Sequence, residues 1–313
     1  MEIQNPPMNL TAFTALGIDV GGTKIAAGIV TFPDGRVHLR RQIPTRAERG
    51  GDAVLDDVLQ LATELTTDGG QQDFQINGIG LGVCELVSIA GDIVSANCLP
   101  WRSEDVREGL ATIAPTVIEA DVRAAALAEA VFGAGRRSRI FVYVTVGTGI
   151  SSCLVLDGQP FIGARGLTGT SASSLLPHSG QPWDSGAAAT LEQIASGPAL
   201  VARFNQVHGR AKTAQEVIAA ALAGNAGALS VVRSAGEALG ATVAWLVNVL
   251  DPESVIIGGG LGLSEGVYWN SMVASVRKTI WSDIHRDLPI VRAATGADAG
   301  LIGAAAAAWK KFS

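Results

Sequence analysis

Three glycine clusters in this sequence could approach a ligand closely; the first two suit phosphate groups, and the third suits a flat base or a ribose. They are Gly21-Gly22-Thr23-Lys24, Gly147-Thr148-Gly149 and Gly258-Gly259-Gly260. Glycine lets the backbone approach a ligand closely, and adjacent N–H groups at a bend can hold phosphate oxygens. Asp19 ends an apolar run just before the first cluster, where its carboxylate could hold Mg²⁺ through the ion's water shell. A single cluster would indicate only a turn, but the three in this order predict an ATP site between two lobes.

The residues after the first cluster exclude a P-loop and a dinucleotide-binding turn. Both of those motifs require a helix directly after the glycines. Here the apolar run 25–30 follows, which is typical of a strand, so residues 17–35 are predicted to form a β-hairpin. Residues 140–158 repeat this plan around Gly-Thr-Gly. The repeat predicts two related lobes, each with one phosphate-binding hairpin, although two glycine-rich hairpins could also coincide by chance.

The hydrophobic pattern alternates strands with helices and predicts an α/β protein. Helices are expected at 52–70, 122–135, 228–250 and 298–312, and further strands at 76–83, 116–121 and 254–261. We expect a smaller domain of residues 13–122, completed by the C-terminal helix 297–313, and a larger domain of residues 123–296.

Composition excludes several classes of partner. The 313 residues carry a net charge of −6 and contain no basic tract, so neither nucleic acid nor an anionic membrane surface is an expected partner. No apolar stretch reaches the ~20 residues that span a bilayer, and the first residues do not resemble a secretory signal. Cys84, Cys98 and Cys153 are too scattered for a disulfide framework. These features predict a cytoplasmic protein.

The ordered motifs resemble those of the ROK sugar kinases, within the actin/hexokinase/Hsp70 superfamily. The segment GIDVGGTK looks like the family's first phosphate motif, and VTVGTGI looks like its second. PESVIIGGGL looks like the adenosine motif, and DAGLIGAA looks like the closing helix. The resemblance spans residues 14–312. It implies the two-lobed, actin-like ATPase fold (ribonuclease H-like) with a cleft between the lobes. It also implies a kinase that uses ATP and Mg²⁺ and is commonly a homodimer.

The resemblance also assigns roles to polar residues. Asp121 would be the general base of phosphoryl transfer, although its position alone favours a helix N-cap. Asn97 lies in a loop similar to the family's substrate loop, and Glu119 and Glu192 match residues that bind the sugar. Ala120 departs from the pattern, because it replaces a sugar-binding Asn.

Further departures lie in the sugar pocket and in the family's zinc motif. Thr170 and Ser173 replace a sugar-binding Glu and a His, and Ser173 is expected to line the altered pocket. Glu85 stands where the family normally has glycine, so it is expected to contact substrate; a solvent-facing carboxylate is the alternative. The cysteine positions of the zinc motif hold Trp183, Ser185 and Thr190. Hydroxyl and indole groups are poor zinc ligands, so no structural zinc is expected.

Together these features predict transfer of the ATP γ-phosphate to a hydroxyl, favouring the 6-hydroxyl, of a hexose or amino-hexose. Glucose, kanosamine and glucosamine are candidates, and the gain of acidic character at Glu85, with the loss of the histidine, favours an amino sugar. A non-catalytic sugar-binding member of the family is the alternative. A regulator with a helix-turn-helix is not expected, because only a dozen residues precede the first strand. The intact residues Asp19, Thr23 and Asp121 favour an enzyme.

Overall fold

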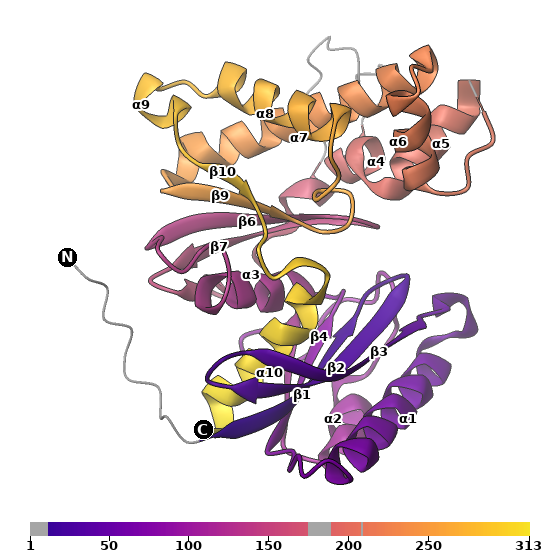
Figure 1. Cartoon of the computed structure of the whole chain (residues 1–313), viewed down its shortest axis with the longest axis vertical. Helices are drawn as coiled ribbons and strands as arrows, with labels where there is room; N and C mark the ends of the chain where they lie inside the picture. Colours follow the sequence, from indigo (N-terminus) through magenta and orange to yellow (C-terminus); the bar gives the residue numbers. More distant parts are fainter. Residues whose placement is uncertain (1–11, 175–188, 208) are drawn as a thin grey trace. The chain divides into compact units, whose positions relative to one another are not determined.

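The computed structural model describes residues 12–174, 189–207 and 209–313, and they group into two compact units (Figure 1). The first unit contains the described residues up to Arg139, Val155–Thr168 and Ala297–Ser313. The second unit contains Ile140–Leu154 and the described part of Gly169–Gly296. Residues 123–139 and 155–168 thus group with the first unit, whereas the sequence pattern places them in the second domain.

The first unit contains a five-stranded sheet in the order β3-β2-β1-β4-β5. The strand β2 (Lys24–Phe32) pairs antiparallel with both of its neighbours, β1 (Phe13–Val20) and β3 (Arg36–Pro44). β4 (Gly78–Val83) runs parallel to β1, and β5 (Thr116–Ala120) runs parallel to β4. The predicted first hairpin is therefore confirmed. The carboxyl ends of β1, β4 and β5 lie at one edge, where parallel sheets present their ligand-binding residues.

Helices cover both faces of this sheet (Figure 1). α1 (Gly51–Gly70) and α2 (Ser103–Ala111) pack on one face, against side chains such as Leu16 and Ile18 of β1. α10 (Ala299–Phe312) packs on the other face, and α3 (Asp121–Val131) packs mainly against α10. Successive side chains of a strand point to opposite faces, so Ala15, Gly17 and Asp19 face α10. A short helical turn, η1 (Ala47–Arg49), precedes α1.

Glycines allow α10 to approach the sheet and α3 with no side chain between them. A Cβ atom on Gly80 of β4 would overlap the carbonyl group of Ala304 in α10. A Cβ on Gly17 of β1 would likewise meet the carbonyl oxygen of Leu301, and one on Gly303 would meet that of Ala124 in α3. The packing of α10 thus depends on the absence of side chains at these positions.

The second unit is built on the strands β6 (Ile140–Val146), β7 (Ile150–Leu156), β9 (Ser254–Gly258) and β10 (Ile290–Arg292), in the order β10-β9-β6-β7. β9 is parallel to β6 and β10. β6 and β7 are neighbours joined by the Gly147–Gly149 bend, which confirms the second predicted hairpin. The short β8 (Gln159–Pro160) pairs with Val155 and Leu156 at the end of β7.

The helices of the second unit surround one long helix. α7 (Ala226–Leu250) has a buried face that contributes much of the core of this unit. The other helical segments are η2 (Thr170–Ser173), α4 (Leu191–Ala195), α5 (Gly197–Val207), α6 (Ala214–Leu222), α8 (Val267–Thr279) and α9 (Asp283–Arg286), and η3 (Gly296–Asp298) leads into α10. Among the described residues no single helix has the length and apolar character needed to cross a membrane, and only α6 and α7, bent by 114°, meet that test as a pair.

The contact between β4 and α10 predicts a large effect of a small substitution. Gly80→Ala is expected to lower the stability of the protein by about 1–3 kcal/mol, because the added methyl group overlaps main-chain atoms that cannot rotate away. The matched control is Gly70→Ala at the end of α1, where a Cβ meets nothing within 4 Å. Urea unfolding of both variants measures the effect; equal stabilities would contradict this account of the packing.

Candidate active site

Two carboxylates lie at the carboxyl edge of the first unit's sheet. Asp19 is next to last in β1, and Asp121 is the first residue of α3, directly after β5. The strand register places Asp19 beside Gly82 of β4, and Gly82 beside Glu119 of β5. Asp19 also faces the first turn of α10, where a Cβ on Gly300 would overlap its carboxylate. The fold therefore collects these acidic residues at one edge.

Burial raises the pKa values of both carboxylates. The pKa of Asp19 rises to about 6, mainly because burial penalises its charge; Lys24 lowers it and Asp298 raises it. The pKa of Asp121 rises to about 7, again mainly through burial. The negative charges of Asp19 and Glu85 raise it further, and the N–H of Val122 lowers it. Asp121 thus has the proton affinity of a general base that works near neutral pH.

The start of α3 shows how Asp121 relates to the alternative in which it only caps the helix. Ala120 occupies the N-cap position of α3, and Asp121 is the first residue within the helix. Its Oδ1 accepts a hydrogen bond from the N–H of Val122 at 2.6 Å. Asp121 therefore gives one first-turn N–H of α3 a partner without occupying the N-cap position, and this contact is compatible with a role as a base.

The first glycine bend is fixed by a residue that the sequence did not single out. Thr45 follows β3 and is fully buried. Its N–H donates to the carbonyl oxygen of Thr23 at 3.1 Å, and its hydroxyl donates to that of Gly21 at 2.6 Å. Gly21 in turn donates its N–H to the carbonyl oxygen of Lys24. Thr45 therefore holds the bend from outside, and the side chains of Thr23 and Lys24 remain exposed.

Glu85 lies just beyond β4 and does not have the open position expected of it. Its side chain is buried, with 4% of the residue exposed. Its two oxygens accept hydrogen bonds from the Ser95 hydroxyl and from three backbone N–H groups, those of Asn97 (3.0 Å), Cys98 (2.5 Å) and Leu99 (2.9 Å). The solvent-facing alternative is therefore wrong. Glu85 binds the loop that carries Asn97, whose own side chain is exposed.

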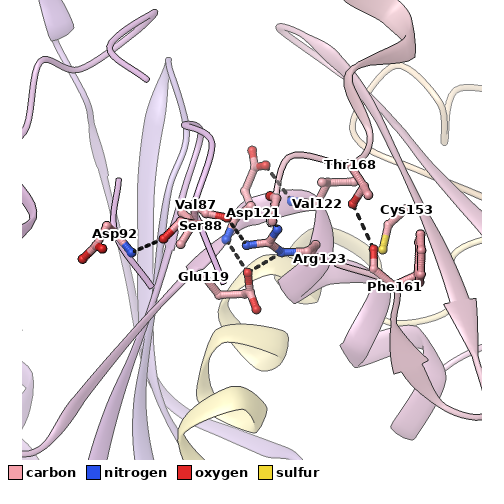
Figure 2. Close-up of polar contacts among 12 residues, drawn as sticks. Val87, Ser88, Asp92, Glu119, Asp121, Val122, Arg123, Cys153, Phe161 and Thr168 are labelled. Atoms are coloured by element: carbon pink, nitrogen blue, oxygen red, sulfur yellow. Dashed lines mark hydrogen bonds and ion pairs between the residues drawn. The ribbon is translucent and has the colours of Figure 1, made fainter. Parts of the chain in front are cut away.

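Glu119 makes a similar structural contact (Figure 2). Its Oε1 accepts hydrogen bonds from Arg123 Nε at 2.5 Å and from the N–H of Ala120 at 2.8 Å. Arg123 is 3% exposed and also donates to the carbonyl oxygens of Val87 and Gly166. Arg123 thus joins the start of α3 to two loops. The sequence signal for this role is a Glu and an Arg four residues apart beside Asp121.

In the second unit the other two glycine clusters are neighbours. Leu261 and Gly262, which follow Gly258–Gly260, both donate their N–H groups to the carbonyl oxygen of Val146, which precedes the Gly147–Gly149 bend. Gly259 has a φ of +80°, and a Cβ there would overlap Val146, so only glycine suits this position. The structure therefore brings together the second phosphate motif and the predicted adenosine motif, including Thr148.

Glu192 of α4 lies beside the same bend. Its Oε2 accepts a hydrogen bond from the N–H of Ile150 at 2.9 Å, and a Cβ on Gly149 would lie 2.9 Å from this oxygen. Ser173 is exposed in η2, which packs on α4 through Ala172. Thr190 caps α4 by accepting the N–H of Gln193. Trp183 and Ser185 lie outside the described residues.

A cavity of about 240 Å³ opens beside Gly260. It is mainly apolar, and it is lined by Ala214, Gln215, Ile218, Ala219, Leu222, Gly260, Leu261 and Ser264. An apolar slot next to a glycine-rich turn suits a flat aromatic ring such as a nucleotide base. The sequence indicated the glycines but not α6, because small apolar residues on a helix usually indicate only core packing.

The raised pKa of Asp121 predicts a cost in stability. The pKa of Asp121 is about 7 in the folded protein, compared with the ordinary value of 3.8 expected for the unfolded chain. Its ionisation therefore lowers the stability of the folded protein increasingly as the pH rises from about 4 to about 7. Asp121→Asn is therefore expected to raise the Tm clearly at pH 8 and less at pH 5. The same substitution at exposed Asp287 should change the Tm about equally at both pH values. If Asp121→Asn changed the Tm equally at pH 5 and at pH 8, the raised pKa of Asp121 would be contradicted.

Comparisons with known proteins agree with the motifs. A sequence model of the ROK family matches residues 15–311. The chain is 30% identical over 265 residues to a glucokinase of Halalkalibacterium halodurans (79% of this chain, 80% of the relative). It is 31% identical over 301 residues to an N-acetylmannosamine kinase of Citrobacter koseri (93% and 97%). Its fold is similar to that of a Streptomyces griseus ROK family glucokinase, solved in complex with glucose and AMPPNP, with a TM-score of 0.81 and 25% identity (95% and 99%). The fold is that of the actin-like ATPases, and the chain belongs to the ROK family.

Proposed function

We propose that this protein is an ATP-dependent sugar kinase that transfers the γ-phosphoryl group to a hydroxyl of a hexose. The observation that carries the proposal is the position of Asp121. It lies directly after β5 at the carboxyl edge of the sheet, near enough to Asp19 for that charge to raise its pKa, which is about 7. The kinases among the relatives support the same class of reaction.

Each residue has a defined task in this mechanism. Asp121 accepts the proton of the attacking hydroxyl, which increases its nucleophilicity as the phosphoryl group is transferred. The backbone groups of Gly21, Gly22, Gly147 and Gly149, with Thr23, Lys24 and Thr148, bind the phosphates. The cavity beside Gly258–Gly260 takes the base. Asn97 and Ser173 contact the sugar. Glu119 and Glu192 also contact it, through carboxylate lone pairs that are not used by their bonds within the protein.

The first unit has a suitable residue for Mg²⁺. Asp19 is a carboxylate whose charge is disfavoured by burial and by the nearby charge of Asp298, so a divalent cation would relieve that cost. Oxygen ligands of this kind suit Mg²⁺, which commonly keeps several waters and binds substrate phosphates. When bound, the ion neutralises charge on the phosphates. Asp19 would orient it through its water shell.

The proposal also extends to the identity of the sugar. We infer a hexose or amino-hexose, such as glucose, kanosamine or glucosamine, phosphorylated at the 6-hydroxyl. The case for an amino sugar depended on a carboxylate at Glu85 that could meet an ammonium group, and on the loss of the family's histidine at Ser173. Because four donors from the loop already occupy that carboxylate, glucose becomes the first substrate to test. A non-catalytic sugar-binding protein is the alternative function.

The proposal predicts that Asp121 is needed for turnover but not for sugar binding. With ATP, Mg²⁺ and either glucose or glucosamine, the parent protein is expected to release ADP in a coupled assay. Asp121→Asn should lower kcat by about 10²–10⁴-fold, because an amide keeps the shape but accepts no proton. Calorimetry should still detect sugar binding.

The control for this assay is Asp287→Asn, which should retain the parent's kcat. Turnover by Asp121→Asn close to the parent's would remove Asp121 from the role of base. Sugar binding without ADP release by the parent, across a panel of neutral and amino sugars, would favour the non-catalytic alternative.

The absence of a structural zinc remains a separate prediction. A closed zinc site needs about four Cys or His ligands. The described part of the chain contains no group of three or more His, Cys, Asp or Glu residues arranged to hold a metal. Elemental analysis of the purified protein should find no stoichiometric zinc, and a strong chelator should leave its Tm unchanged. Loss of structure on chelation would contradict the prediction.

A further inference from the structure

Glu85 binds a whole loop through one side chain. The loop comprises Ser95–Leu99, and the side chain of Glu85 accepts one hydrogen bond from the Ser95 hydroxyl and three from backbone N–H groups. Hydrogen bonds that involve a carboxylate are stronger than those between neutral groups. Glu85 lies two residues after the end of β4, so the residue that holds the loop is itself close to the sheet.

The two ends of this loop have anchors of their own. Before the loop, the N–H of Ile93 donates to the Ser103 hydroxyl at 2.7 Å. After it, the indole N–H of Trp101 donates to the carbonyl oxygen of Gly51 at 2.7 Å. Neither contact depends on Glu85. The middle of the loop, which carries Asn97, is therefore the part whose conformation Glu85 controls.

The bonds to Glu85 also provide partners for groups that would otherwise lack them. The backbone N–H groups of Asn97, Cys98 and Leu99 belong to no helix or strand, and Leu99 is fully buried. A buried N–H group without a partner is costly. Three consecutive N–H groups that converge on one carboxylate give the loop a single favoured conformation. The side chain of Asn97 is then exposed at a fixed position before any sugar arrives.

We propose that Glu85 is a positioning residue that pre-organises the Asn97 loop for the sugar. The inference rests on the proposed function, in that Asn97 is taken to contact the substrate. Glu85 itself touches no substrate, because its acceptor sites face the loop. A loop that is ordered in advance loses less conformational entropy when ligand binds, so the effect of Glu85 should appear mainly in sugar affinity.

The variant that tests this role is Glu85→Gln. It keeps the length of the side chain, but its amide nitrogen donates and therefore cannot accept from the N–H groups that converge there. We expect KM for the sugar to rise by about tenfold or more, with kcat changed less than about threefold. In the sugar-free protein, hydrogen exchange at the amides of residues 97–99 should become faster.

Two further variants complete the design. Asp92→Asn is the matched control, because Asp92 is an acidic residue of the same stretch whose carboxylate pairs with Arg107 instead of with the loop. It should leave KM and the exchange rates unchanged. Ser95→Ala removes one of the four donors, together with the hydroxyl that accepts the N–H of Leu86 at 2.8 Å, and should shift KM and exchange in the same direction as Glu85→Gln. It also provides the test if Glu85→Gln does not fold.

A pH profile separates positioning from a general loss of structure. The negative charge of Glu85 raises the pKa of Asp121, as does that of Asp19. The neutral Glu85→Gln variant should therefore have a lower pKa at Asp121, and as the pH falls it should lose activity at a lower pH than the parent does. In a folded variant, KM and exchange rates within twofold of the parent's would overturn the proposal, as would a loss of kcat as large as the rise in KM. If the parent phosphorylates no sugar, the proposed function fails, whereas the exchange measurement still decides whether Glu85 orders the loop.

Discussion

The close approach of α10 to β1, β4 and α3 is the contact on which the first unit depends. Because glycines occupy the contact points, backbone lies against backbone there. This approach brings the first turn of α10 against Asp19 and contributes to the burial that raises its pKa. Asp19 in turn raises the pKa of Asp121. A packing constraint in the core thus helps to set the proton affinity of the residue that we assign as the base.

A second regularity is that buried polar side chains order the irregular segments around the site. Thr45 holds the first glycine bend, Glu85 holds the Asn97 loop, and Arg123 holds the loops at Val87 and Gly166. Glu192 does the same for the start of β7. Loop backbone groups lack the partners that a sheet provides, so side chains based at the ends of strands and helices supply them. The loops thereby gain order from the regular structure beside them.

The sequence predicted the features that depend on local patterns. Both hairpins, α1, α7 and α10 were expected because apolar spacing and glycine position act over a few residues. The partners of Glu85 and Arg123 were not, because the donors to Glu85 lie 10–14 residues away and the Gly166 carbonyl lies 43 residues from Arg123. A carboxylate beside a glycine turn looks the same in sequence whether it contacts substrate or backbone. Only the fold distinguishes these two roles.

The place of α10 in the chain has a consequence for synthesis on the ribosome. The second unit is complete once residue 296 has been made, whereas the first still lacks its last segment, which contains α10. Until then, the face of the first sheet that carries Ala15 and Ala26 has no cover from Leu301 and Trp309. The nascent chain therefore exposes an apolar sheet face until its last segment has been made. The unit that begins first is the last to receive all its segments, and an exposed apolar sheet face favours aggregation.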